Sequence, residues 1–144
     1  MAELNCQFVR PDRSLFEGPV ASLVLVTYAG ELGVWPGHAP EIVALGDGVV
    51  RLRQRPEDGG KEYDVVVSGG YAEIDDDGVI ILADPARRID DIDPDVVRAT
   101  RDEAIARLDD VSDGDHRRAY YENKVSWCNL LLKQALGDSV ATPL

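Results

Sequence analysis

The sequence predicts an antiparallel β-sandwich or flattened barrel of about eight to ten short strands, followed by an antiparallel helical hairpin. In residues 1–84, runs rich in β-branched residues alternate with Gly, Pro and Asp turn signals. After Asp84 the apolar residues recur with the period of a helix. We therefore expect a β domain over 1–84, a charged linker over 85–93, a helical hairpin over 94–137 and a tail over 138–144.

The strands are predicted from alternation between turn signals. The expected strands cover residues 4–9, 15–19, 20–28, 49–53, 61–68, 71–75 and 79–84. The VVRLR run over 49–53 alternates apolar and basic residues, as a half-buried strand does. RPEDGG at residues 55–60 is the clearest hairpin tip, because Asp-Gly and Gly-Gly pairs tolerate the positive φ of tight turns.

The two helices are predicted from their start signals and seams. Asp93 can accept hydrogen bonds from the first free N–H groups of a helix, and Pro94 suits its first position. The acidic segment 109–114 ends this helix, and a second one is expected over 115–136, before Gly137. Helices of this length are marginal alone, so we expect them to pair. The expected seam residues are Val97, Arg101, Ala104 and Leu108, then Tyr121, Val125, Cys128, Leu132 and Ala135.

The charge balance excludes several partners. The 144 residues include 27 acidic and 15 basic side chains, a formal net charge of −12. Such a chain gains little from nucleic acid and is repelled by an anionic membrane surface. Its start lacks the pattern of a signal peptide, and its longest apolar runs are far shorter than the roughly 18 residues of a membrane span. We expect a soluble protein that reaches a membrane only through another protein.

Residues for chemistry are scarce. The sequence contains no GxxxxGK[ST], GxGxxG or GxSxG motif, and its two histidines, His38 and His116, lie in different halves. Cys6 and Cys128 have no activating pattern and are interpreted as reduced thiols. We expect no catalytic residue, metal or cofactor. A cupin-type enzyme, one alternative, needs a histidine cluster that the β half lacks.

One acidic segment imitates a calcium loop. The residues Glu73, Asp75, Asp77, Gly78 and Asp84 have the spacing of an EF-hand loop. The first and last positions depart from that pattern, and strands are expected on both sides where an EF-hand needs helices. A hairpin with an acidic tip is the preferred interpretation.

The most informative segment is GELGVWPGHAP, residues 30–40. Three glycines and two prolines fix its backbone into consecutive turns, and Trp35 is a large apolar anchor. A well-packed loop at a sandwich edge explains these residues. A rigid docking surface explains them equally well, because little entropy remains to be lost on binding.

This segment resembles the GELGILPGHAP signature of the epsilon subunits of bacterial-type rotary ATP synthases, the counterparts of the mitochondrial delta subunit. Further resemblances follow in the same order along about residues 5–108. They are FVRPDR at 8–13, VVRLR at 49–53, VSGGYAE at 67–73 and VIILAD at 79–84. The resemblance implies a sandwich of about ten strands, a helical hairpin and a non-catalytic subunit.

The family resemblance also implies partners. Such subunits lie at the foot of the central stalk, where they clamp the gamma subunit, rest on the membrane c-ring and couple its rotation to ATP synthesis. The implied c-ring contacts are Tyr28, Ala29, Gly30, Glu31, Leu32 and Gly33, with Glu31 at the tip of the turn. The implied gamma contacts are Trp35, His38, Ala39 and Pro40, together with one sandwich face. The implied location is peripheral, on the cytoplasmic face of the bacterial plasma membrane.

In the family, the hairpin is a regulator that permits turnover when folded and blocks ATP hydrolysis when extended. The basic residues Arg117, Arg118, Lys124 and Lys133 are the candidates to meet the alpha and beta subunits of the catalytic head. A permanently folded hairpin is the alternative.

A nucleotide-sensing module is the other function considered. Some members bind ATP through an I/L-D-x-x-R-A motif, to which Asp93 and Arg98 correspond here. The sequence departs from that motif, because two additional residues separate the Asp from the Arg-Ala pair. Val125 and Asn129 also stand where arginines are expected on the second helix.

Overall fold

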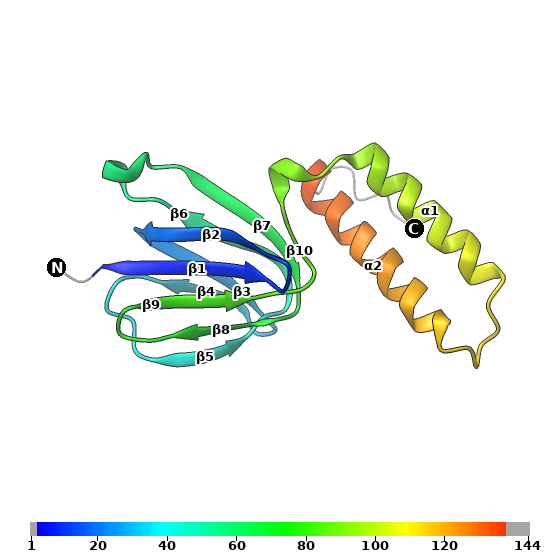
Figure 1. The fold of residues 1–144 in the computed structure, drawn as a ribbon, viewed down its shortest axis with the longest axis horizontal. Helices are drawn as coiled ribbons and strands as arrows, with labels where there is room; N and C mark the ends of the chain where they lie inside the picture. The colour runs from blue at the N-terminus through cyan, green and yellow to red at the C-terminus, as the bar shows by residue number, and fades with distance from the viewer. Residues whose placement is uncertain (1–2, 138–144) are drawn as a thin grey trace. The chain divides into compact units, whose positions relative to one another are not determined.

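The computed structural model describes residues 3–137, which form two compact units, one up to Asp90 and one from Asp91 onward. The first unit contains ten strands in two five-stranded sheets, and the second contains two α-helices (Figure 1). The predicted fold class, a β-sandwich followed by a helical hairpin, is confirmed.

The first sheet has the strand order β2-β1-β9-β8-β5. Its strands are β2 (Arg13–Val20), β1 (Leu4–Arg10), β9 (Gly78–Leu82), β8 (Tyr71–Ile74) and β5 (Glu41–Ala44). All its neighbours are antiparallel except β1 and β9, which run parallel with Cys6 opposite Val79. The sheet therefore joins the N-terminal hairpin to the later β8–β9 hairpin through one parallel pair.

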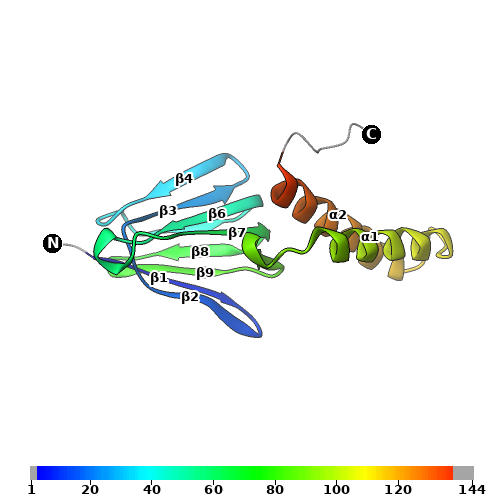
Figure 2. The same cartoon turned by 90° about the horizontal axis from the view of Figure 1, so that it is seen from above.

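The second sheet has the order β10-β7-β6-β3-β4 and is antiparallel throughout. Its strands are β10 (Ala86–Arg88), β7 (Glu62–Ser68), β6 (Asp47–Arg53), β3 (Ser22–Thr27) and β4 (Gly30–Val34). The segment RPEDGG connects β6 and β7 as the predicted hairpin tip, and it also contains a short 3-10 helix, Pro56–Asp58, that was not predicted. Viewed from above, β3 and β4 lie on one side of the unit and β1 and β2 on the other (Figure 2).

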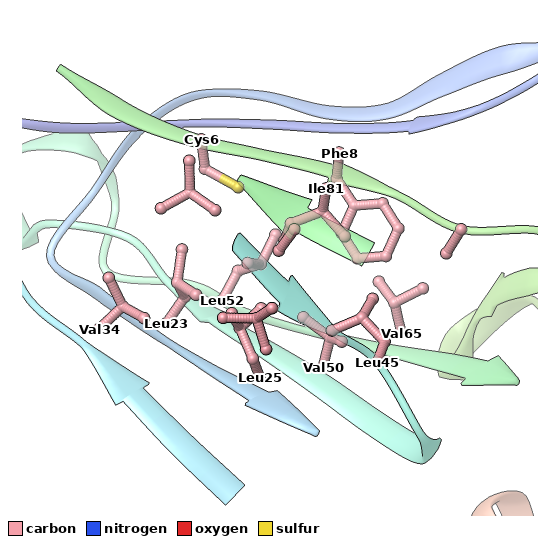
Figure 3. Packing of buried hydrophobic residues seen from close by; sticks show 14 of the residues in the cluster. Cys6, Phe8, Leu23, Leu25, Val34, Leu45, Val50, Leu52, Val65 and Ile81 are labelled. Atoms are coloured by element: carbon pink, nitrogen blue, oxygen red, sulfur yellow. The ribbon is translucent and has the colours of Figure 1, made fainter. Parts of the chain in front are cut away.

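The core of the first unit lies between the sheets. Alternate residues of most strands point inward, so that Phe8 and Ile81 from the first sheet meet Leu25, Val50 and other apolar residues from the second (Figure 3). These side chains are fully buried or nearly so, and no polar side chain among the described residues is buried with them. The apolar core is what makes the sandwich a stiff support for the loops at its ends.

Three strands were not predicted. The motif segment 30–40, expected as consecutive turns, begins with β4, and the following residues include the start of β5. The segment 85–93, expected as a linker, contains β10, in which Ala86 is buried and stands opposite Val67. The pairing comes from tertiary context, because three residues of sequence carry too little periodicity to predict a strand.

The helical unit contains α1 (Pro94–Asp109) and α2 (Arg117–Leu136), which run antiparallel side by side. Asp93 caps α1 as predicted, since its Oδ1 accepts from the N–H groups of Asp95 at 3.0 Å and Val96 at 3.4 Å. Gly137 ends α2 as predicted and donates to the Lys133 carbonyl. Buried seam positions are Val97, Ala104, Cys128 and Leu132, with Leu131 in addition to the prediction.

Candidate functional site

The β3–β4 hairpin presents an exposed tip at Tyr28 and Ala29. Thr27 and Gly30 form the last pair of the ladder, and the Thr27 hydroxyl both donates to the Gly30 carbonyl at 2.6 Å and accepts from the Ala29 N–H. The Tyr28 side chain is 81% exposed. The hydroxyl bridge fixes the backbone of the tip, and so it presents an aromatic side chain from a rigid support.

The expected position of Glu31 at this tip is wrong. Glu31 lies within β4, opposite Val26, on the exposed edge strand of the second sheet. Strand pairing continues to Thr27 and Gly30, so the tip of the hairpin lies at Tyr28 and Ala29, about two residues before Glu31. The carboxylate is therefore displayed beside the tip.

Residues 35–38 form a tight turn directly after β4. The His38 N–H donates to the Trp35 carbonyl at 3.2 Å, with Pro36 and Gly37 in between and a φ of +88° at Gly37. Proline followed by a positive-φ glycine is the signature of a type II turn. The turn leaves Trp35 60% exposed. Trp35 is anchored by its backbone and presents its ring to solvent.

His38 is half-buried at the end of the same turn. Its Nδ1 lies 2.7 Å from the Ala39 carbonyl, and because a carbonyl only accepts, Nδ1 carries the proton. Its Nε2 lies 4.0 Å from a carboxylate oxygen of Glu41. The ring is thus oriented by its own loop, and Ala39 and Pro40 beside it are exposed. The structure brings Trp35, His38, Ala39 and Pro40 into one rigid connection between the sheets.

The outer face of the first sheet carries exposed apolar side chains that the sequence interpretation did not single out. Ile42 on β5 is 75% exposed, Tyr71 on β8 is 51% exposed, and Ile80 on β9 is also exposed. Glu73 stands opposite both Ile42 and Ile80 in register, so these residues share one face. Strand alternation could have placed Ile80 outward, but Ile42 belongs to a strand that was not predicted.

The residues proposed for nucleotide binding have other partners. The Asp93 carboxylate caps α1, and Arg98 donates to Asp95 at 3.0 Å one turn along the helix. On α2, Asn129 accepts from Arg101 at 3.4 Å, and Val125 is half-buried. Asp93 and Arg98 thus both lie at the start of α1, and both interact with Asp95 in the first turn of the helix.

The four basic residues of α2 do not form one cluster. Arg117 pairs with Asp115 at 2.7 Å and Arg118 pairs with Glu122 at 3.0 Å. Lys124 lies over the Tyr120 ring, 5.6 Å from its centroid. Arg117 and Lys124 are seven residues apart on one helix face, whereas Lys133 is exposed on another.

Two groups that can take part in chemistry, Cys6 and Asp75, have structural roles. Burial raises the pKa of the Cys6 thiol to about 12, so it stays protonated at neutral pH. Asp75 in the acidic segment accepts from the N–H groups of Asp77 and Gly78, which closes the β8–β9 hairpin. Within residues 3–137, no group of His, Cys, Asp and Glu has the geometry of a metal site.

Two further findings concern the hydropathy of the helices and the family of the sandwich. No helix among residues 3–137 is long and apolar enough to cross a membrane. Residues 3–89, which coincide with the sandwich, match the family described as ATP synthase, Delta/Epsilon chain, beta-sandwich domain.

The sequence is also similar to curated proteins over most of this chain and most of theirs. An ATP synthase epsilon chain of Microcystis aeruginosa is 34% identical over 86% of this chain and 87% of its own length. That of Moorella thermoacetica is 43% identical over 75% and 78%. Among solved structures, a chain of the Euglena gracilis mitochondrial ATP synthase (OSCP, F1 and c-ring) aligns with a TM-score of 0.66. It is 26% identical, and the match covers 97% of this chain and 82% of that one.

Proposed function

Because the chain belongs to the ATP synthase delta/epsilon family, we propose that it is the central-stalk subunit that clamps a gamma subunit to a c-ring. In this function it couples rotation of the ring to ATP synthesis and carries out no reaction itself. The observation that carries the proposal is a rigid sandwich that presents two backbone-fixed loops, one at each end of β4.

The c-ring contact is proposed at the β3–β4 hairpin, residues 28–33. Tyr28 projects from the tip, and Glu31 is exposed on the adjoining strand, so an aromatic ring and a carboxylate are available together. This surface can bind the polar loops of a ring subunit through hydrogen bonds and aromatic contacts, without a large apolar interface. The Thr27 hydrogen bonds stiffen this tip, which suits an element that transmits torque.

The gamma contact is proposed at Trp35, His38, Ala39 and Pro40 and on the neighbouring outer face of the first sheet. That face exposes Ile42, Tyr71 and Ile80, and large exposed apolar side chains on one sheet face are typical of protein interfaces. β5 begins directly after Pro40, so the turn residues and Ile42 lie on one continuous path of the chain.

The helical hairpin is proposed as the regulatory element. Its own seam and caps make it a separate compact unit, as a part that changes position requires. Arg117 and Lys124 share one face of α2 and are the residues proposed to meet acidic surfaces of the alpha and beta subunits. We place the chain at the cytoplasmic face of the bacterial plasma membrane, held there by the complex.

Association and coupling test the proposal together. The full chain is expected to co-purify in equal amount with a tagged gamma subunit from its own organism. Vesicles carrying the ring and head are expected to pump ions on addition of ATP only when the chain is supplied. Lack of association with gamma, or undiminished pumping in its absence, contradicts the clamp. Turnover of a substrate by the isolated chain contradicts it as well.

A further inference from the structure

A groove of about 260 Å³ lies on the outer face of the second sheet. Leu23 on β3 and Leu52 on β6 point into the core, so the residues beside them face outward. In register, Ser22 stands opposite Arg53 and Val24 opposite Arg51, which forms the floor of the groove. The side chains that line it are those of Ser22, Val24, Trp35, Arg51, Arg53 and Glu62.

The Trp35 ring lines the groove, and its position is restricted by the backbone turn and by its close approach to Gly33. Its backbone is fixed by the hydrogen-bonded turn to His38. Its ring lies so close over Gly33 that a Cβ atom at that position would overlap the ring. Val24 stands opposite Gly33 in register, and Val24 and Trp35 both line the groove. The apolar wall exists before any partner binds, and little side-chain entropy is lost on binding.

Two arginines and one glutamate line the groove, although the whole chain is strongly acidic. Arg53 donates to a single oxygen of Glu62, Oε1, from Nε at 3.1 Å and from Nη2 at 2.7 Å. Arg51 is exposed, and within residues 3–137 no ion pair or side-chain hydrogen bond joins it to another group. Asp64 is its cross-strand neighbour, without an ion pair between the two. The Arg51 guanidinium is therefore available to an incoming anion.

The size and chemistry of the groove indicate what it binds. At about 260 Å³ the groove is smaller than the roughly 300–1,000 Å³ of cofactor and drug-sized sites, and one protein side chain fits within it. Tryptophan and arginine are the residue types that contribute most at interface centres. An acidic side chain can contact both residue types. Its carboxylate can form forked, charge-assisted hydrogen bonds with an arginine guanidinium, and its aliphatic stem can pack against a tryptophan ring.

We propose that this groove binds an acidic side chain of the gamma subunit, with its carboxylate on Arg51 and its aliphatic stem against Trp35 and Val24. The inference rests on the proposed function, because it names the surface through which the same partner is held. It extends the gamma contact from the turn onto β3 and β6, the strands that follow β4 in the order of the second sheet.

The test is calorimetric titration of the full chain with purified gamma subunit at low and physiological salt. Trp35→Ala and Arg51→Glu are each expected to weaken binding about tenfold or more. The loss for Arg51→Glu is expected to shrink as salt rises. The matched control is Lys61→Glu, which makes the same change of charge at an exposed position outside the groove and is expected to leave affinity within about twofold.

The outcomes separate the two proposals. If the unaltered chain does not bind gamma, the clamp function itself is wrong. If it binds and both groove variants retain full affinity, the groove inference is wrong and the clamp stands. If only Trp35→Ala weakens the affinity for gamma, the proposal of an acidic occupant is wrong. If Arg51→Glu and Lys61→Glu weaken the affinity equally, Arg51 makes no specific contact. Both groove side chains are exposed, and unchanged thermal unfolding of the variants establishes that each remains folded.

Discussion

Gly33 is the residue on which the orientation of Trp35 depends. A Cβ at this position would occupy the space of the indole ring, so the missing side chain is part of the docking surface. The motif to which this segment is similar has leucine where this chain has Trp35. The indole ring is larger than a leucine side chain, so it enlarges the contact that this chain can make. The missing side chain of Gly33 lets the ring lie close to β4.

A second residue, Asp115, controls the start of α2. Its Oδ1 accepts from the Arg117 N–H at 2.9 Å, and its Oδ2 accepts from the Arg117 guanidinium at 2.7 Å. The Arg117 side-chain hydrogen bond, followed by the backbone one, lowers the pKa of Asp115 to about 2. Since the folded pKa lies below the unfolded value near 3.8, its stabilisation is present above pH 3.8 and is lost as pH falls toward 2.

We therefore expect the Asp115 carboxyl carbon to titrate near pH 2 in an NMR pH series. Asp115→Asn is expected to reduce the part of the acid-induced loss of stability that occurs between about pH 4 and 2. Asp113→Asn, which changes a fully exposed carboxylate two residues earlier, is the control and is expected to leave the Asp115 titration in place. A midpoint near 3.8 for Asp115 would show that the Arg117 bridge does not form in solution.

At the scale of elements, the sequence predicted those with a strong local signal. β1, β6, β7 and both helices have clear alternation or caps, and their observed ends lie within about two residues of the prediction. β4 was missed because two glycines in five residues disfavour a strand, and pairing with β3 overrides that preference. β10 was missed because only Ala86 of its three residues is buried.

The position of β10 leads to a prediction about where the chain can be cut. The Ser68 N–H donates to the Pro85 carbonyl at 3.3 Å, and Arg10 donates to the Ala86 carbonyl at 3.3 Å. A stop after Asp84 removes these acceptors and exposes the β7 edge, whereas a stop after Asp91 keeps them. We expect the shorter protein to be less stable by about 1–3 kcal/mol in urea unfolding. Equal midpoints would show that β10 adds nothing.

The longer of these truncated proteins is also the appropriate one for testing the hairpin. Added to an assembled catalytic head, it is expected to give faster ATP hydrolysis than the full chain, because the hairpin that we propose as the regulatory element has been removed while the sandwich remains complete. Equal rates would remove the inhibitory role and leave the clamp intact. The stop after Asp84 would confuse lost inhibition with a weakened sandwich.

At the scale of the whole molecule, the order of several motifs along the chain predicted the family, whereas no motif predicted the groove. The groove combines Val24, Trp35, Arg51 and Glu62 from separate parts of the sequence, and only strand register brings them together. The same holds for the face that exposes Ile42 and Tyr71. Surfaces assembled from several strands leave no local pattern, so they become visible only in the folded chain.

The net charge of −12 also bears on nucleotide sensing. ATP is a polyanion, so a site for it must gather several cations, and here Arg98 is paired with Asp95 while Asp93 caps α1. We expect calorimetry of the full chain with millimolar ATP and Mg²⁺ to give no heat beyond dilution. A saturable heat that Arg98→Ala abolishes and Lys61→Ala preserves would instead establish the hairpin as a nucleotide sensor. In that case the local pairs of α1 must open on binding, and loss of the Asp93 cap would appear as reduced helicity in circular dichroism.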